Sequence, residues 1–111
     1  MSNVSDFYCE QVLSKKMKVK VEYESETVLA FHHTKPSYKV HIVIIPKKHI
    51  ASLVDISDHH QPLLWEIIRV AKELAQRLDL EQDGARLITN LGKFQDSPHL
   101  HFHLTSGAKI N

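Results

Sequence analysis

The chain has 111 residues, of which only one is cysteine, three are glycine and four are proline. The single cysteine, Cys9, has no partner for an internal disulfide, which favours a reducing, cytoplasmic location. No window approaches the roughly 20 apolar residues of a membrane span. The first six residues also lack the basic and apolar stretches of a secretory signal. We therefore expect a cytoplasmic protein without a membrane partner.

An excess of charge is missing as well, because 14 Lys and Arg residues oppose 13 Asp and Glu residues. A net charge of +1 provides no field that would attract nucleic acid, so an anionic ligand must be held by local groups. Neither repeats nor a linker rich in Gly, Ser or Pro divide the chain, which predicts one domain over residues 1–111. What the composition does contain is nine histidines.

Hydrophobic periodicity predicts an α+β fold, with an antiparallel sheet of about five strands, one long helix and a short N-terminal helix. Residues 39–45 are apolar on both faces, which is typical of a central strand, and Pro46 should end it. The other expected elements are a helix over 7–13, a hairpin of 20–23 with 28–32, and strands over 85–90 and 99–105.

The long helix is predicted to start at Ser57, which is a suitable N-cap with Asp58 in the first turn. Apolar residues recur at helical spacing for about six turns, which indicates one amphipathic helix packed on the sheet. The residues expected on its buried face are Leu64, Ile67, Ile68, Ala71, Leu74, Ala75 and Leu78.

The most informative segment is the run from His99 to His103, in which histidines alternate with apolar residues. In a strand, His99, His101 and His103 project from one face while Leu100 and Phe102 project from the other. A strand that needs only a polar outer face is usually built from Thr, Lys or Glu, which do not titrate near neutrality. Three imidazoles on one face therefore predict a reactive face.

Metal binding by all three histidines does not agree with strand geometry. His99 and His103 would lie about 13 Å apart in an extended strand, whereas a metal–nitrogen bond is about 2.1 Å long. At most two neighbours could ligate one ion, and Asp96 is the only carboxylate near the motif. Without a Cys-x-x-Cys pair elsewhere, the sequence predicts no metal and no cofactor.

Acyl transfer through Ser97 or Ser106 is also possible, but neither serine lies in a Gly-x-Ser-x-Gly turn. Phosphorus chemistry agrees better with the motif, because a neutral imidazole is a good nucleophile near pH 7. Flanking imidazoles can donate hydrogen bonds to phosphoryl oxygens. We therefore predict that His101, the central histidine, attacks phosphorus and forms a covalent phospho-histidine intermediate.

These residues resemble the histidine triad family, through His99-Leu100-His101-Phe102-His103-Leu104 and the upstream segment from His41 to Pro46-Lys47-Lys48-His49. The resemblance extends from about Phe7 to Gly107. It implies an α+β fold, a homodimer with a joined sheet, and hydrolysis or transfer at the α-phosphorus of nucleotides. A purine nucleotide or nucleotide conjugate is the implied substrate.

The same resemblance implies roles for individual residues. His101 would be the nucleophile, His99 and His103 would orient it and bind phosphate, and His41 would be the fourth histidine of the site. Asn90 would contact ribose or phosphate, and Gln95 would lie in the loop over the phosphate. Phe7, Tyr8 and Val12 fall where the family forms its base pocket, or else they belong to the core.

Three positions depart from the family pattern. His33 stands where the purine-nucleoside branch carries an aspartate for the ribose hydroxyls, which affects sugar recognition. Asp96 stands where serine is common, with Ser97 one place later, and a carboxylate there repels phosphate unless it serves in proton transfer. Many relatives bind zinc through two N-terminal cysteines and two histidines. Asp6 replaces the first of these cysteines and only Cys9 remains, which predicts no structural zinc.

Three functions remain open from the sequence. The favoured one is a nucleoside phosphoramidate or nucleotidyl hydrolase that works through His101. The second is a nucleotide-binding module with little turnover, which the departures at His33 and Asp96 make plausible. The third is a dinucleoside polyphosphate hydrolase, which a preference for substrates with two nucleosides would distinguish.

Overall fold

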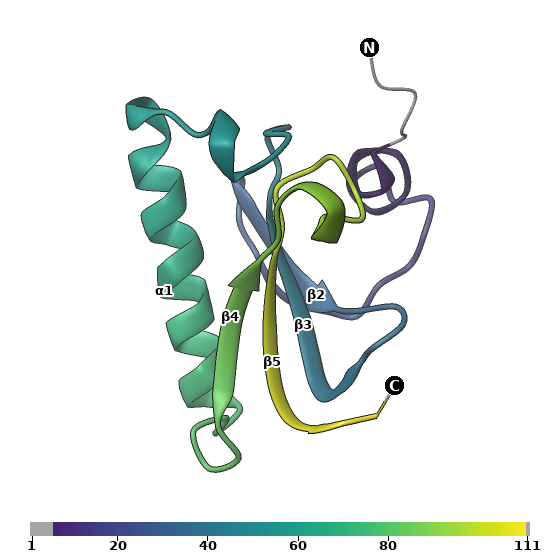
Figure 1. Ribbon diagram of the computed structural model, residues 1–111, viewed down its shortest axis with the longest axis vertical. Coiled ribbons are helices and arrows are strands. Elements are labelled where there is room, and N and C mark those ends of the chain that lie inside the picture. The colour runs from purple at the N-terminus through teal and green to yellow at the C-terminus, as the bar shows by residue number, and fades with distance from the viewer. Residues whose placement is uncertain (1–5, 111) are drawn as a thin grey trace.

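A computed structural model describes residues 6–110 of the chain. It contains one five-stranded antiparallel sheet in the order β1-β2-β3-β5-β4, together with one long helix, α1 (Figure 1). The strands are β1 (Val21–Glu24), β2 (Val28–His32), β3 (Tyr38–Pro46), β4 (Ala85–Thr89) and β5 (Phe102–Lys109). The predicted α+β fold is therefore confirmed.

Strand β3 lies between β2 and β5, as the apolar pattern on both of its faces predicted. On one face, Ile42 and Ile44 pack in a core cluster with residues of α1. On the other face, Val43 and Ile45 pack with residues of the N-terminal π-helix η1 (Tyr8–Leu13). The sheet is therefore covered by α1 on one side and by η1 on the other, and Pro46 is the last residue of β3.

Helix α1 comprises Gln61–Arg77 and therefore starts later than at Ser57, the predicted N-cap. Ser57 instead caps the short 3₁₀ helix η3 (Asp58–His60), which follows another 3₁₀ turn, η2 (Leu53–Asp55). Pro62 explains the later start, because proline is tolerated only in the first turn of an α-helix. Within residues 6–110, no helix is both long and apolar enough to span a membrane.

The buried face of α1 consists of Ile67, Val70, Ala71 and Leu74. The prediction that Ile68 belongs to this face is wrong, since Ile68 is 43% exposed. Adjacent helical residues point about 100° apart, so Ile68 lies outside the stripe that contains Ile67. Trp65 on the same helix is 60% exposed, which leaves an apolar surface on the outer side of α1.

Strand β5 starts at Phe102, three residues after the predicted start at His99. The segment before it is held by other contacts: the His99 N–H donates to the Ser97 carbonyl, and the Leu100 N–H donates to the Ile50 carbonyl. His99 and His101 therefore precede the sheet ladder, and only His103 occupies a strand position. The expected row of three imidazoles on one strand face is consequently not present.

Candidate active site

His101 lies immediately before β5, where two hydrogen bonds fix it. Its Nδ1 is 2.7 Å from the carbonyl oxygen of His99. Because a carbonyl only accepts hydrogen bonds, Nδ1 carries the proton and Nε2 of the neutral ring holds a lone pair. The Thr89 hydroxyl on β4 donates to the His101 carbonyl over 2.9 Å and holds the backbone. The residue is 2% exposed, so its ring is held rigidly.

Two buried side-chain polar atoms within residues 6–110 have no hydrogen-bond partner, namely Nε2 of His101 and Oγ of Ser97. The carboxylate of Asp96 is 3.2 Å from that Nε2, but an unprotonated nitrogen cannot donate to it. Buried polar atoms are nearly always satisfied in folded proteins. Both atoms therefore retain an unused capacity for a hydrogen bond at this place.

Beside His101, the rings of His33, His41 and His103 form what we call the imidazole cluster. The Lys35 N–H donates to Nδ1 of His33 over 2.9 Å, and the Ser37 N–H donates to Nδ1 of His41 over 3.0 Å. The proton of each neutral ring is consequently on Nε2.

The second nitrogen of His41 links the cluster to β5. Its Nε2 donates to Nδ1 of His103 over 2.8 Å, so His103 carries its own proton on Nε2. The ring centroids of His101 and His103 are 5.0 Å apart. The imidazole cluster thus presents N–H donors next to the unprotonated nitrogen of His101, an arrangement suited to an anionic group.

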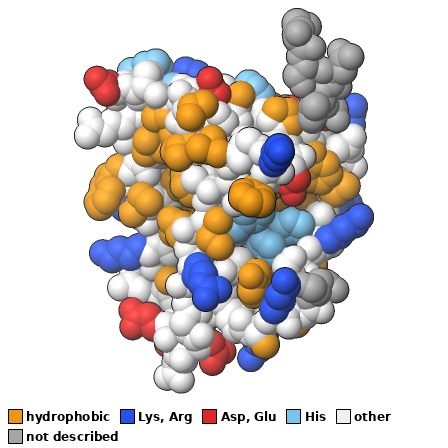
Figure 2. All heavy atoms as spheres, in the orientation of Figure 1, with side chains coloured by type: hydrophobic (Ala, Val, Ile, Leu, Met, Phe, Trp, Pro, Cys, Tyr) orange, Lys and Arg blue, Asp and Glu red, His pale blue; other side chains and the backbone are white. Residues whose placement is uncertain are grey.

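Burial sets the protonation of this cluster. Burial and the charges of neighbouring histidines lower the pKa of His41 and of His103 to about 4 each. Burial also lowers the pKa of His33. All three rings are consequently neutral at pH 7, in agreement with the hydrogen bonds described above. Figure 2 shows a patch of histidine side chains near the middle of the visible face, bordered by apolar and cationic side chains.

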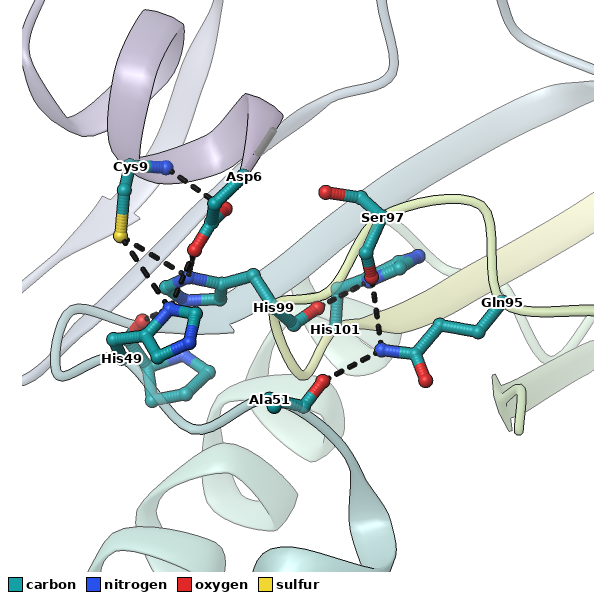
Figure 3. Close-up of polar contacts among 9 residues, drawn as sticks. Asp6, Cys9, His49, Ala51, Gln95, Ser97, His99 and His101 are labelled. Atoms are coloured by element: carbon teal, nitrogen blue, oxygen red, sulfur yellow. Dashed lines mark hydrogen bonds and ion pairs between the residues drawn. The ribbon is translucent and has the colours of Figure 1, made fainter. Parts of the chain in front are cut away.

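The loop between β4 and β5 lies over His101 and is braced by Gln95. Its side-chain Nε2 donates to the Ala51 carbonyl over 2.7 Å and to the Ser97 carbonyl over 2.8 Å (Figure 3). Gln95 therefore positions the loop, while the side chain of Asp96 is 73% exposed. Asn90 follows the end of β4 and is half-buried.

The aromatic residues of η1 border the site from the other side. Tyr8 is buried, with its ring centroid 4.8 Å from that of His101. Val12 is buried in the same apolar cluster as Tyr8, and Phe7 packs edge-on against Tyr8 with a centroid distance of 5.3 Å. Tyr8 therefore lies next to the ring of His101, and Phe7 and Val12 pack with Tyr8.

His99 does not join the other histidines of the site, although the sequence motif placed it among them. Its ring is fully buried and points toward Asp6, Cys9 and His49, as Figure 3 shows. We call these four residues the mixed cluster. Nδ1 of His99 is 2.9 Å from Oδ2 of Asp6 and 3.4 Å from Sγ of Cys9. Nδ1 of His49 is 2.5 Å from the same Asp6 oxygen.

The donor set of the mixed cluster fits a divalent cation. One atom of each side chain lies within 4.8 Å of the other three, and carboxylate, thiolate and imidazole are all zinc ligands. In the chain without a cation, burial and the Asp6 carboxylate raise the pKa of the Cys9 thiol to about 11. Burial tends to raise the pKa of Asp6, but hydrogen bonds from the backbone N–H and the thiol of Cys9 act against it, and the pKa is lowered.

Sequence reasoning missed four contributors to these sites: Asp6, Cys9, His49 and Thr89. The first three were considered only as an incomplete version of a pattern with two cysteines, although the Asp6-x-x-Cys9 spacing was visible. Thr89 carries no sequence signal, because its role depends on β4 pairing with the start of β5.

Comparison with known proteins was made for sequence and for structure. The family model described as scavenger mRNA decapping enzyme C-terminal binding matches residues 6–110. The purine nucleoside phosphoramidase of Escherichia coli K12 is 31% identical over 102 residues, which cover 90% of this chain and 86% of the relative. A HIT-like protein of Buchnera aphidicola is 29% identical, over 93% of this chain and 97% of the relative.

Solved structures of similar proteins have the same fold. A HIT family hydrolase from Legionella pneumophila superposes with a TM-score of 0.86 at 34% identity, over 96% of each chain. A histidine triad protein from Clostridium difficile has a TM-score of 0.84 at 32% identity, over 100% of this chain and 97% of that one.

Proposed function

This chain belongs to the histidine triad family, and from that membership we propose that it hydrolyses or transfers nucleotides at the α-phosphorus. The favoured substrate is a purine nucleoside phosphoramidate or a related nucleotidyl conjugate, since a relative at 31% identity is a purine nucleoside phosphoramidase. The observation that carries the proposal is the buried Nε2 of His101, which holds a lone pair and has no hydrogen-bond partner.

In the first step, Nε2 of His101 attacks the α-phosphorus. A P–N bond forms while the bond from phosphorus to the leaving group breaks, and the leaving group takes up a proton from solvent as it departs. The ring of His101 becomes positive, and its Nδ1–H remains donated to the His99 carbonyl, which stabilises that charge. In the second step, water attacks the same phosphorus, one proton of the water passes to solvent and the P–N bond breaks, which releases the nucleoside monophosphate and restores the neutral imidazole.

The phosphoryl oxygens need donors that do not rearrange during the reaction. We assign this role to Nε2–H of His103, whose tautomer is fixed by His41, and to the hydroxyl of Ser97. His41 is then a positioning residue that acts through His103. Both rings are neutral at pH 7, so His103 contacts phosphate as a neutral hydrogen-bond donor, while the N–H of His41 remains on His103.

The remaining site residues are assigned by their places around His101. His99 orients the nucleophile through its carbonyl. Gln95 shapes the phosphate loop, and Asn90 is assigned to the ribose or phosphate. Phe7, Tyr8 and Val12 are assigned to the side of the base. His33 extends the imidazole cluster where the family's purine-nucleoside branch has an aspartate, so we expect weaker dependence on the ribose hydroxyls.

A fluorogenic adenosine phosphoramidate tests the proposal directly. Wild-type protein is expected to release the amine, and quenching during turnover should trap a chain that carries one nucleoside monophosphate on His101, visible by mass spectrometry. The matched control is His59→Ala, which removes an exposed histidine outside both clusters. Equal activity of His101→Ala and wild type would exclude His101 as the nucleophile.

A nucleotide-binding module with little turnover is the second candidate. Asp96 favours it, because its carboxylate lies 3.2 Å from the nucleophilic nitrogen, where it repels an incoming phosphate. Adenosine monophosphate binding in calorimetry, without hydrolysis of phosphoramidates or dinucleoside polyphosphates, would select this function. Preferential hydrolysis of dinucleoside polyphosphates would show that the protein is a dinucleoside polyphosphate hydrolase, the third function left open by the sequence.

We also propose that the chain forms a homodimer. Strand β4 is an edge of the sheet, and Leu87 on it is 37% exposed. Trp65 and Ile68 of α1 are exposed as well. An open edge strand with apolar surface favours pairing with a second copy. Light scattering after size exclusion should give twice the chain mass, and Leu87→Lys should give the monomer, with Lys16→Glu at an exposed position after η1 as control.

A further inference from the structure

His33, which follows the end of β2, lies beside the reacting groups. Its backbone N–H donates to the His41 carbonyl over 2.8 Å, so His33 lies opposite His41 on the neighbouring strand. The His33 ring is 4.4 Å from that of His41 and 6.0 Å from that of His103, measured between centroids. The proposed reaction uses His41 and His103, but it gives His33 no contact with the substrate.

Hydrogen bonding fixes which group His33 offers to a ligand. The Lys35 N–H donates to Nδ1 of His33 over 2.9 Å, so the neutral ring carries its proton on Nε2. Among residues 6–110, no group accepts a hydrogen bond from this Nε2. The residue is half-buried, so a ligand can reach the ring. His33 therefore presents one hydrogen-bond donor and no acceptor.

The place of the sugar follows from the proposed function, on which this inference rests. Tyr8 is assigned to the side of the base, and the ring of Phe31 on β2 lies 6.1 Å from it. The α-phosphate is assigned to His101 and His103. His33 follows Phe31 by two residues, so both side chains point to the same face of the sheet. The sugar joins the base to the α-phosphate and therefore passes next to His33.

A cation accompanies this donor. The side chain of Lys35 is exposed and forms no ion pair within residues 6–110. The carboxylate of Asp96 also acts on His33, but its side chain is 73% exposed, where solvent and salt screen the charge. Hydrogen bonds to a charged oxygen are roughly twice as strong as those to a neutral one. A donor beside an unpaired cation therefore favours an anionic acceptor over a hydroxyl.

We propose that His33 and Lys35 bind a phosphate group on the sugar of the nucleotide, at its 2′ or 3′ oxygen. Nε2–H of His33 donates to a phosphate oxygen, and the ammonium group of Lys35 neutralises part of the phosphate charge. An unmodified hydroxyl gives this ring only a neutral acceptor, and its own proton finds no acceptor there. The preferred substrate is therefore a nucleotide conjugate whose sugar carries a phosphomonoester, and His33 determines that specificity.

Calorimetry of nucleotide binding to the full chain at pH 7 tests the proposal without turnover. The ligands are adenosine 5′-monophosphate and the two bisphosphates that add a phosphate at the 3′ or at the 2′ oxygen. Wild type should bind one bisphosphate at least about tenfold more tightly than the monophosphate, which is the effect of one hydrogen bond to a charged group. The bisphosphate that gains affinity identifies the oxygen that carries the phosphate.

Variants identify the groups that bind the added phosphate. His33→Asp should reverse the preference, because a carboxylate repels phosphate but accepts hydrogen bonds from both sugar hydroxyls. His33→Gln keeps an N–H donor and should still prefer the bisphosphate. Lys35→Ala should reduce the preference by up to about fivefold, as expected for an exposed ion pair. His59→Asp, the control, makes the same change at an exposed histidine outside both clusters and should match wild type.

Three outcomes would overturn the inference. Equal binding of the monophosphate and both bisphosphates by wild type would reject the phosphate subsite and leave the proposed function intact. A preference that His33→Asp retains would show that other groups bind the added phosphate, while its binding of the monophosphate shows that the variant is folded. No binding of any of the three ligands, together with no hydrolysis of the phosphoramidate, would reject the proposed function as well.

Discussion

In the imidazole cluster, backbone N–H groups donate to Nδ1 of His33 and His41, whereas in the mixed cluster the Pro46 carbonyl accepts from Nε2 of His99. The first arrangement leaves N–H donors for a ligand, and the second leaves a lone pair. The difference teaches that backbone partners, rather than the presence of histidine, determine which ring nitrogen each cluster presents and whether that nitrogen donates or accepts.

The comparison also separates the members of the histidine motif. His103 belongs to the imidazole cluster with His101 beside it, and His99 belongs to the mixed cluster, although all three lie within five residues. The two clusters are connected by the carbonyl of His99, which accepts a hydrogen bond from His101. Changes at the reacting nitrogen should therefore abolish turnover, while changes in the mixed cluster should act on stability first.

The largest expected effect is at the nucleophile. His101→Ala should lower kcat by at least about 10³-fold, because a covalent nucleophile is removed. Cys9→Ser should retain more than a tenth of wild-type kcat, since Cys9 touches neither substrate nor His101. Steady-state kinetics with the phosphoramidate measures both. Comparable losses in the two variants would contradict the separation of the clusters.

Acid should lower the stability of the folded protein through the histidines of the imidazole cluster. The pKa of about 4 for His41 and His103 lies below the value of about 6.5 expected in the unfolded chain. Between these values the unfolded chain binds more protons, so stability is complete above about pH 6.5 and falls as the pH decreases toward 4. The melting temperature should drop by about 5 °C or more from pH 7 to pH 5.

Two substitutions test which groups cause the fall of the melting temperature with decreasing pH. His41→Gln should make this fall smaller, because one of the two histidines with a lowered pKa is then gone. His59→Gln, which removes an exposed histidine, should leave the fall unchanged. If the melting temperature of His41→Gln falls between pH 7 and pH 5 as much as that of wild type, the acid sensitivity belongs to other groups.

The smallest effect is expected at Asp96. Asp96→Ser removes a carboxylate that lies 3.2 Å from Nε2 of His101, so KM for an anionic nucleotide should fall by about three- to tenfold. If Asp96 instead delivers a proton to the leaving group, kcat would fall while KM changes little. The neutral isostere Asp96→Asn is the control, because it removes the charge at nearly constant size.

The fold was largely predictable because apolar periodicity directly reflects which faces are buried. The central position of β3, the β1–β2 hairpin and the long helix all followed from patterns of two or about 3.6 residues. Errors arose where local rules competed. Pro62 delayed the start of α1, and contacts of Leu100 with Ile50 delayed the start of β5.

The site was predictable in part. The motif and the resemblance predicted a role for each of the histidines, and the structure places His101 and His103 close together, with ring centroids 5.0 Å apart. The motif did not indicate that His99 turns toward Asp6, because that depends on where the N-terminal segment packs. Thr89 likewise became visible only through the pairing of β4 with β5.

The sequence by itself determined the α+β architecture, the family and the location of the histidine motif, because these depend on short-range patterns of apolar and histidine residues. The tertiary structure alone decided which nitrogen of each histidine carries a proton and which residues meet at the mixed cluster. Those properties depend on backbone carbonyl and N–H groups contributed by distant segments, such as Pro46 to His99. No local pattern of side chains encodes such contacts.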